Sequence, residues 1–147
     1  MTSFASAAWA EQLAARLQES ARVRTESMSW VFGPLVLLVD ADVEHGLKAT
    51  AIRIDLHEGA VRGVEVVPGA DAGRSPFVLG GSLARWKTVF GGSLALVDAV
   101  LDSRVRAAGD LPTLARHRGL LDAIAAAAGE VDTAWQDEQE PASASAG

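Results

Sequence analysis

The stretch FVLGGSLARWKTVFGGSLALVDAVLDSRVRAAGDLPTLARHRGLL, residues 77–121, decides the fold. It contains the pentapeptide GGSLA twice, at residues 80–84 and again at residues 91–95. Paired glycines before a serine fit three structures: a phosphate-binding loop, a nucleophile on a tight turn, or the start of a helix. Choosing among them separates an enzyme from a protein that only binds.

The helix start explains both copies best. A nucleophile elbow needs G-x-S-x-G between a strand and a helix, but Ala84 replaces the last glycine of the first copy and the second copy follows a helix. Neither G-x-x-x-x-G-K-[ST] nor G-x-G-x-x-G is present. We therefore predict that Ser82 and Ser93 are N-caps, whose side-chain oxygens accept hydrogen bonds from first-turn N–H groups.

Two apolar helices should follow these caps. Leu83, Trp86, Val89 and Phe90 fall on one face of the first helix. The second, SLALVDAVLD at residues 93–102, is apolar nearly all round, so it must be covered on all sides. Periodicity leaves two explanations open: the helix lies at the centre of the core, or one flank faces a ligand-sized apolar cavity.

The rest of the chain predicts an α+β domain. We expect helices at residues 7–24 and 110–128, the latter capped by Asp110, and strands near residues 35–42, 47–57, 60–68, 77–79 and 105–108. The segment LKATAIRIDLHEG, residues 47–59, alternates, with Ile52, Ile54 and Leu56 on one face. Short turns between strands favour antiparallel pairing, with helices over one face of the sheet.

Composition indicates one domain at residues 1–129 and an acidic, disordered tail at residues 130–147. The tail holds five acids and no Lys or Arg, and it accounts for all but one of the six net negative charges. The body therefore has no basic surface for nucleic acid. No window is apolar enough for stable membrane insertion, and the N-terminal sequence lacks the pattern of a secretory signal, so we expect a cytoplasmic protein.

Catalytic and metal-binding patterns are absent from the sequence. There is no cysteine, and the three histidines, His45, His57 and His117, are isolated. The sequence HEG at residues 57–59 lacks the second histidine of H-E-x-x-H. We therefore predict no catalytic residues, no metal site and no cofactor.

Residues 77–121 resemble the C-terminal half of the sterol-carrier-protein type lipid-binding domain. The resemblance is carried by the strand and cap at residues 79–82, by Trp86, by Gly91 and Gly92, by the alternating strand at residues 104–107 and by the Gly-Asp pair at 109–110. With the upstream helix and strands it extends over residues 8–128. It implies a five-stranded, mainly antiparallel sheet covered by about four helices that enclose a hydrophobic tunnel.

The resemblance implies a protein that binds and transfers a sterol, fatty acid, fatty acyl-CoA or phospholipid without catalysis. The expected tunnel walls are Ile54, Phe77, Trp86, Phe90, Leu94, Val97, Leu101, Leu121 and Ile124. Two alternatives stay open. One is an enzyme or accessory protein that acts on an apolar biosynthetic intermediate, with Asp98 or His117 supplying a proton. The other is a homodimeric interaction domain without a ligand.

Overall fold

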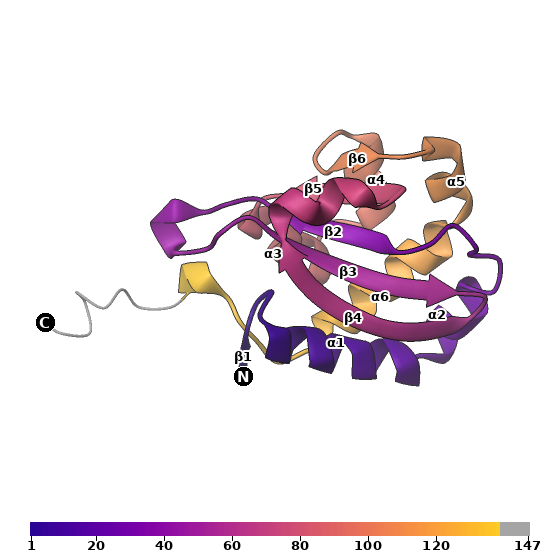
Figure 1. The fold of residues 1–147 in the computed structure, drawn as a ribbon, viewed down its shortest axis with the longest axis horizontal. Helices are drawn as coiled ribbons and strands as arrows, with labels where there is room; N and C mark the ends of the chain where they lie inside the picture. The colour runs from indigo at the N-terminus through magenta and orange to yellow at the C-terminus, as the bar shows by residue number, and fades with distance from the viewer. Residues whose placement is uncertain (139–147) are drawn as a thin grey trace, which may run out of the picture.

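The computed structural model describes residues 1–138 and contains a central sheet of five strands (Figure 1). The spatial order is β4-β3-β2-β5-β6. The strands are β2 (Leu35–Val39), β3 (Thr50–His57), β4 (Ala60–Pro68), β5 (Phe77–Gly81) and β6 (Arg106–Ala108). The five strands therefore lie close to the segments expected from the sequence.

The sheet is mixed. The pairs β2–β3, β3–β4 and β5–β6 are antiparallel, as the short connections predicted, whereas β2 and β5 run parallel from Leu35↔Phe77 to Val39↔Gly81. The parallel pair arises because the β3–β4 hairpin and the following 3-10 segment η2 (Gly69–Arg74) carry the chain back across the sheet before β5 begins.

Residues 1–138 contain six α-helices where about four were expected. They are α1 (Ala7–Glu19), α2 (Ala21–Glu26), α3 (Leu83–Phe90), α4 (Leu96–Leu101), α5 (Leu111–Arg116) and α6 (Arg118–Gly129). The helices predicted at residues 7–24 and 110–128 are each two helices. Ser20 ends α1 and its side chain accepts a hydrogen bond from Val23 N to start α2, while His117 separates α5 from α6.

The core lies between one face of the sheet and the helices. Ile52, Ile54 and Leu56 are fully buried there, whereas Arg53 between them is exposed, which confirms the alternation predicted for β3. Helix α1 lies along β4, and α6 contacts α1 to α5 (Figure 1). On the opposite face, η2 covers a smaller cluster built on Val36 and Ala51.

The two GGSLA copies differ in structure. Ser82 caps α3 as predicted, since its hydroxyl accepts a hydrogen bond from Arg85 N at 3.1 Å. The prediction for Ser93 was wrong, because α4 begins at Leu96 with Ala95 as its N-cap. The cause is the turn that follows α3: Gly92 has φ +85°, and residues 91–95 form an irregular connection before the next helix.

The boundary predicted for the disordered tail, residue 130, lies before residues that are folded in the structure. Residues 133–134 form β7 (Thr133–Ala134), which pairs in parallel with β1 (Thr2–Ser3), and η3 (Gln136–Glu138) follows. The described part of the acidic segment is therefore folded onto the domain, because apolar Val131 and Trp135 find partners there. The remainder of the predicted tail, residues 139–147, lies outside the described residues.

Within residues 1–138, no helix is both long enough and apolar enough to cross a bilayer.

Candidate functional site

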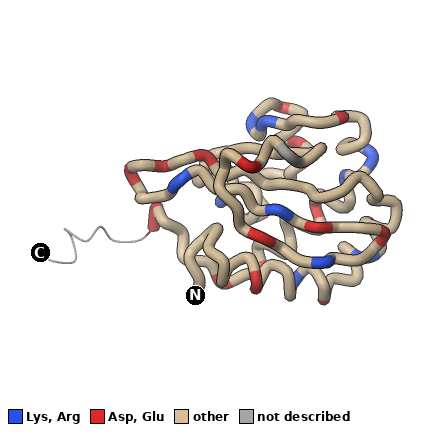
Figure 2. The backbone as a smooth tube through the Cα atoms, viewed as in Figure 1, with Lys and Arg blue, Asp and Glu red and all other residues tan. Residues whose placement is uncertain are grey.

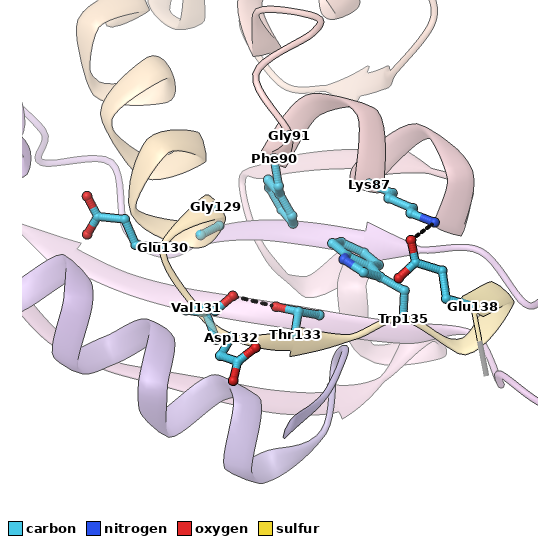
Figure 3. Close-up of a pocket in the computed structure, with 11 residues that line it drawn as sticks. Lys87, Phe90, Gly91, Gly129, Glu130, Val131, Asp132, Thr133, Trp135 and Glu138 are labelled. Atoms are coloured by element: carbon cyan, nitrogen blue, oxygen red, sulfur yellow. Dashed lines mark hydrogen bonds and ion pairs between the residues drawn. The ribbon is translucent and has the colours of Figure 1, made fainter. Parts of the chain in front are cut away.

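A cavity of about 630 Å³ lies at the edge of the helical layer, where α3 and α6 end beside the C-terminal segment (Figure 3). We call it the edge cavity. Phe90 and Gly91 come from the end of α3, and Ala128 and Gly129 from the end of α6. Its remaining lining residues are Lys87, Glu130, Val131, Asp132, Thr133, Trp135 and Glu138.

The two helix ends meet closely beside this cavity. A Cβ atom on Gly129 would lie closer to the backbone oxygen of Phe90 than Cβ atoms come to other heavy atoms in real structures. Glycine at this position therefore allows the C-terminal end of α6 to approach the end of α3.

The rings of Phe90 and Trp135 line the edge cavity, and three further aromatic residues pack against them: Phe4, Trp9 and Trp86. Phe4 lies 5.0 Å from Trp9 and 4.5 Å from Trp135 between ring centroids, and Phe90 lies 5.5 Å from Trp86 and 6.3 Å from Trp135. We call these five residues the aromatic cluster. Their rings present a large apolar surface whose polar indole N–H groups must each find an acceptor when buried.

Those acceptors tie the cluster to the fold. Trp86 Nε1 donates to Leu38 O at 3.0 Å, which fixes α3 against β2. Trp9 Nε1 donates to Thr133 Oγ1 at 2.9 Å, which joins α1 to the C-terminal segment. Trp86 and Trp9 are both fully buried, so losing either bond would leave an unsatisfied donor in the core.

Residues 131–138 cross the edge cavity as a strap, which we call the C-terminal strap. Phe4 N donates to Ala134 O at 3.0 Å, and Gln136 Nε2 donates to Phe4 O at 2.8 Å. Trp135 lies between Phe90 and the charged pair of Lys87 and Glu138, as Figure 3 shows. The strap therefore covers aromatic surface and is held there by hydrogen bonds to Phe4.

Among the described residues, Lys87 is the only basic one that lines the edge cavity. Its Nζ lies 3.2 Å from Asp137 Oδ1 and 2.5 Å from Glu138 Oε1, both in η3. The hydrogen bond to Glu138 is the main cause that raises the pKa of Lys87 above its ordinary value, with a further contribution from Asp137. Lys87 is therefore a cation at neutral pH.

The predicted wall residues fall into three groups. Phe90 lines both the edge cavity and a smaller one of about 180 Å³, which Leu94 also lines. Leu101, at the end of α4, is 61% exposed. The prediction that this helix is covered on all sides was therefore wrong. The others are buried in the main core: Ile54, Phe77, Trp86, Val97, Leu121 and Ile124.

That core is filled where the tunnel was expected, since Ile54, Leu121 and Ile124 are fully buried in one cluster. The ligand contacts predicted for these residues remain predictions. Sequence reasoning missed Lys87, Val131, Thr133 and Trp135. The signal for Trp135 was available, because a tryptophan in an acidic segment is unusual for a disordered tail.

The residues considered as proton donors lie elsewhere. Asp98 is half exposed and pairs with Arg118 at 2.9 Å. His117 is buried between Thr113 O, 2.8 Å from Nδ1, and Ser29 Oγ, 3.1 Å from Nε2. Neither residue lines the edge cavity.

Within residues 1–138, one group of side chains has donor atoms close enough for a metal ion: Asp42, Glu44 and His45, within 4.8 Å of one another. They lie at η1 (Val43–His45), on the loop where acidic residues gather near η3 (Figure 2). Asp42 caps this turn by accepting from His45 N, and its carboxylate lies 2.9 Å from His45 Nδ1. This capping contact explains their proximity.

Comparison with solved structures places the fold. A crystal structure of sterol carrier protein 2 is 30% identical, superposes with a TM-score of 0.80, and is matched over 87% of this chain and 98% of its own. The chain belongs to the sterol carrier protein 2 family. The family's α+β fold was therefore predicted correctly from the sequence.

Two further structures resemble this sterol carrier protein 2 family member. The solution structure of a conserved hypothetical protein from Thermus thermophilus is 29% identical with a TM-score of 0.80, over 91% of this chain and 93% of that one. A UbiJ-SCP2 ubiquinone synthesis protein is 18% identical with a TM-score of 0.51, over 80% and 88%, and shares the fold. No family model matches the sequence, and no curated protein matches it.

Proposed function

We propose that this protein binds and transfers a hydrophobic ligand, a sterol, fatty acid, fatty acyl-CoA or phospholipid, without catalysing a reaction on it. The observation that carries the proposal is the edge cavity, which Phe90 and Trp135 of the aromatic cluster line, in a member of the sterol carrier protein 2 family. A sterol carrier is, by its name, a protein that holds an apolar molecule. The proposed site of action is the cytoplasm.

The size of the edge cavity and two of its lining residues support this proposal. Its volume of about 630 Å³ lies within the roughly 300–1,000 Å³ typical of small-molecule sites. Each CH₂ group removed from water contributes about 0.8 kcal/mol, so an acyl chain needs few polar contacts to bind. Phe90 and Trp135 contribute such apolar surface to the lining.

Native mass spectrometry of the protein purified under mild conditions tests the proposal. We expect a bound species whose mass identifies a lipid, and organic extraction should release it. Delipidated protein should then take up an added acyl ligand, with a change in tryptophan emission and a rise in melting temperature, because the ligand binds the native state. Protein that neither carries nor takes up a lipid, sterol or acyl-CoA would contradict the proposal.

A further inference from the structure

Ser29 and His117 form a hydrogen-bonded pair at the start of α6, away from the edge cavity. Ser29 Oγ lies 3.1 Å from His117 Nε2, although the two residues are 88 positions apart in the sequence. His117 directly precedes α6, whereas Gly129, the last residue of that helix, lines the edge cavity. A helix of 12 residues is about 18 Å long, so the pair and the edge cavity lie at opposite ends of α6.

The hydrogen bonds of the His117 ring determine which nitrogen faces Ser29 as an acceptor. Nδ1 lies 2.8 Å from Thr113 O, and a carbonyl oxygen only accepts hydrogen bonds, so Nδ1 carries the proton of the neutral ring. Nε2 is then the acceptor, and the Ser29 hydroxyl donates to it. A hydroxyl that faces a base, in a ring oriented by a third group, is the arrangement of an activated nucleophile.

The ring is buried, whereas the hydroxyl residue is exposed. His117 packs against the rings of Trp30 and Phe32 in T-shaped contacts, at centroid distances of 5.1 and 5.6 Å. These contacts keep Nε2 directed at Ser29. Ser29 itself lies at the surface, so a solute in water can reach a hydroxyl that is already bonded to a buried base.

The backbone on both sides of Ser29 is anchored to the turn between β3 and β4. Gly59 N donates to Ser27 O at 3.1 Å, and Glu58 N donates to Trp30 O at 2.9 Å. These two bonds fix the segment that leaves the short helix α2. The hydroxyl and the imidazole are therefore held in one geometry before any reactant arrives, as a nucleophile and its base must be.

We infer that Ser29 is a nucleophile, activated by His117, that accepts an acyl group from an activated ester or thioester. Its Oγ forms a bond to the carbonyl carbon of the donor while the hydroxyl proton moves to Nε2. The tetrahedral intermediate then expels the oxygen or sulfur leaving group, and Nε2 returns the proton to that group or to water. The product is an ester on Ser29. This inference goes beyond the proposed function and does not depend on a ligand in the edge cavity.

Acetylation by p-nitrophenyl acetate tests the inference. Release of p-nitrophenolate gives the rate, and peptide mass spectrometry identifies the modified residue. Wild-type protein should acquire an acetyl ester on Ser29. Alkaline hydroxylamine should remove this group, because it cleaves an acyl ester and leaves an acetylated lysine intact. Acetylation of Ser29 should be slower in D₂O than in H₂O, because a proton moves to Nε2 during the attack.

Three variants separate a reactive pair from a structural hydrogen bond. Ser29→Ala should abolish the hydroxylamine-sensitive ester. His117→Gln keeps a donor and an acceptor but removes the base, so it should slow acetylation of Ser29 by about 100-fold. Ser93→Ala is the matched control, because Ser93 is an exposed serine in the connection between α3 and α4, and it should leave the rate unchanged.

Two results would overturn the inference through the site and rate of labelling. One is acetylation confined to lysines and the N-terminus of the wild-type protein. The other is an ester on Ser29 that forms equally fast in wild type and in His117→Gln. Equal rates in H₂O and D₂O would also overturn it, and this measurement needs only the wild-type protein if His117→Gln does not fold. Each result would show that Ser29 only satisfies the buried ring.

Discussion

Replacing Thr133 by valine should loosen the C-terminal strap without unfolding the domain. Thr133 Oγ1 accepts from Trp9 Nε1 at 2.9 Å and donates to Val131 O at 2.9 Å. Valine keeps the shape but leaves the fully buried Trp9 indole N–H without its acceptor. An unsatisfied buried donor costs about 1–3 kcal/mol, which corresponds to about 5- to 150-fold in the opening equilibrium of the strap.

Residue-resolved hydrogen exchange measures this opening. The Phe4 amide donates to Ala134 O across β1 and β7, so its exchange should accelerate by that factor in Thr133→Val. Amides between β2 and β3 should exchange at the wild-type rate. Thr88→Val is the matched control, because the Thr88 hydroxyl bonds to Ala84 O on the exposed side of α3.

The double-mutant cycle with Trp9→Phe assigns the effect to this one bond. Trp9→Phe should also accelerate exchange at Phe4, and the double variant should exceed neither single variant by much, because both remove the same interaction. Exchange at Phe4 that stays at the wild-type rate in Thr133→Val would refute the role given to this bond. Acceleration throughout β2 and β3 would show global destabilisation instead.

Three further perturbations have defined outcomes. Gly109→Ala should destabilise the fold by about 1–3 kcal/mol in urea unfolding, because Gly109 has φ +123° and an added Cβ would lie 2.6 Å from a ring carbon of Phe77 in β5. Ile124→Ala should cost about 2–5 kcal/mol in the same assay, whereas Leu101→Ala should cost less than about 0.5 kcal/mol, since Ile124 is fully buried and Leu101 is 61% exposed. The pKa of His45, followed by NMR, should lie above its usual value because of its hydrogen bond to Asp42, so the protection that this bond gives to the η1 loop should be present in mildly acidic solution and be lost as pH rises through that pKa.

Each of these has a control. Gly63→Ala should be tolerated, because an added Cβ there meets no atom within 4 Å. Equal losses of stability in Ile124→Ala and Leu101→Ala would contradict their assigned burial. Asp42→Asn should return the pKa of His45 toward its ordinary value while keeping a side-chain cap on η1, and an unchanged pKa in that variant would exclude Asp42 as the cause.

Local patterns in the sequence predicted most of the sheet. The alternation in β3 needs only residues 50–57, because side chains on a strand alternate between the core and solvent. The cap at Ser82 is equally local, since its partner Arg85 N lies three residues away. Such features could be read from the chain without its tertiary structure.

The candidate site depended on contacts that no local pattern encodes. Trp135 packs against Phe4, 131 residues earlier, through a two-residue strand pairing too short to produce periodicity. The acids Asp137 and Glu138 suggested a solvated tail, but they pair with Lys87 from a distant helix. The composition of this segment predicted disorder because its one large aromatic residue was outweighed by charge.

Photo-crosslinking with a diazirine-labelled fatty acid tests the central claim, that a hydrophobic ligand binds in the edge cavity. Crosslinked peptides are mapped by mass spectrometry after delipidation and reloading of the protein. We predict labels on Phe90, Val131 and Trp135, and competition by unlabelled fatty acid. Labels that spread over the whole surface, or that lie only on elements away from α3 and the C-terminal strap, would contradict the claim.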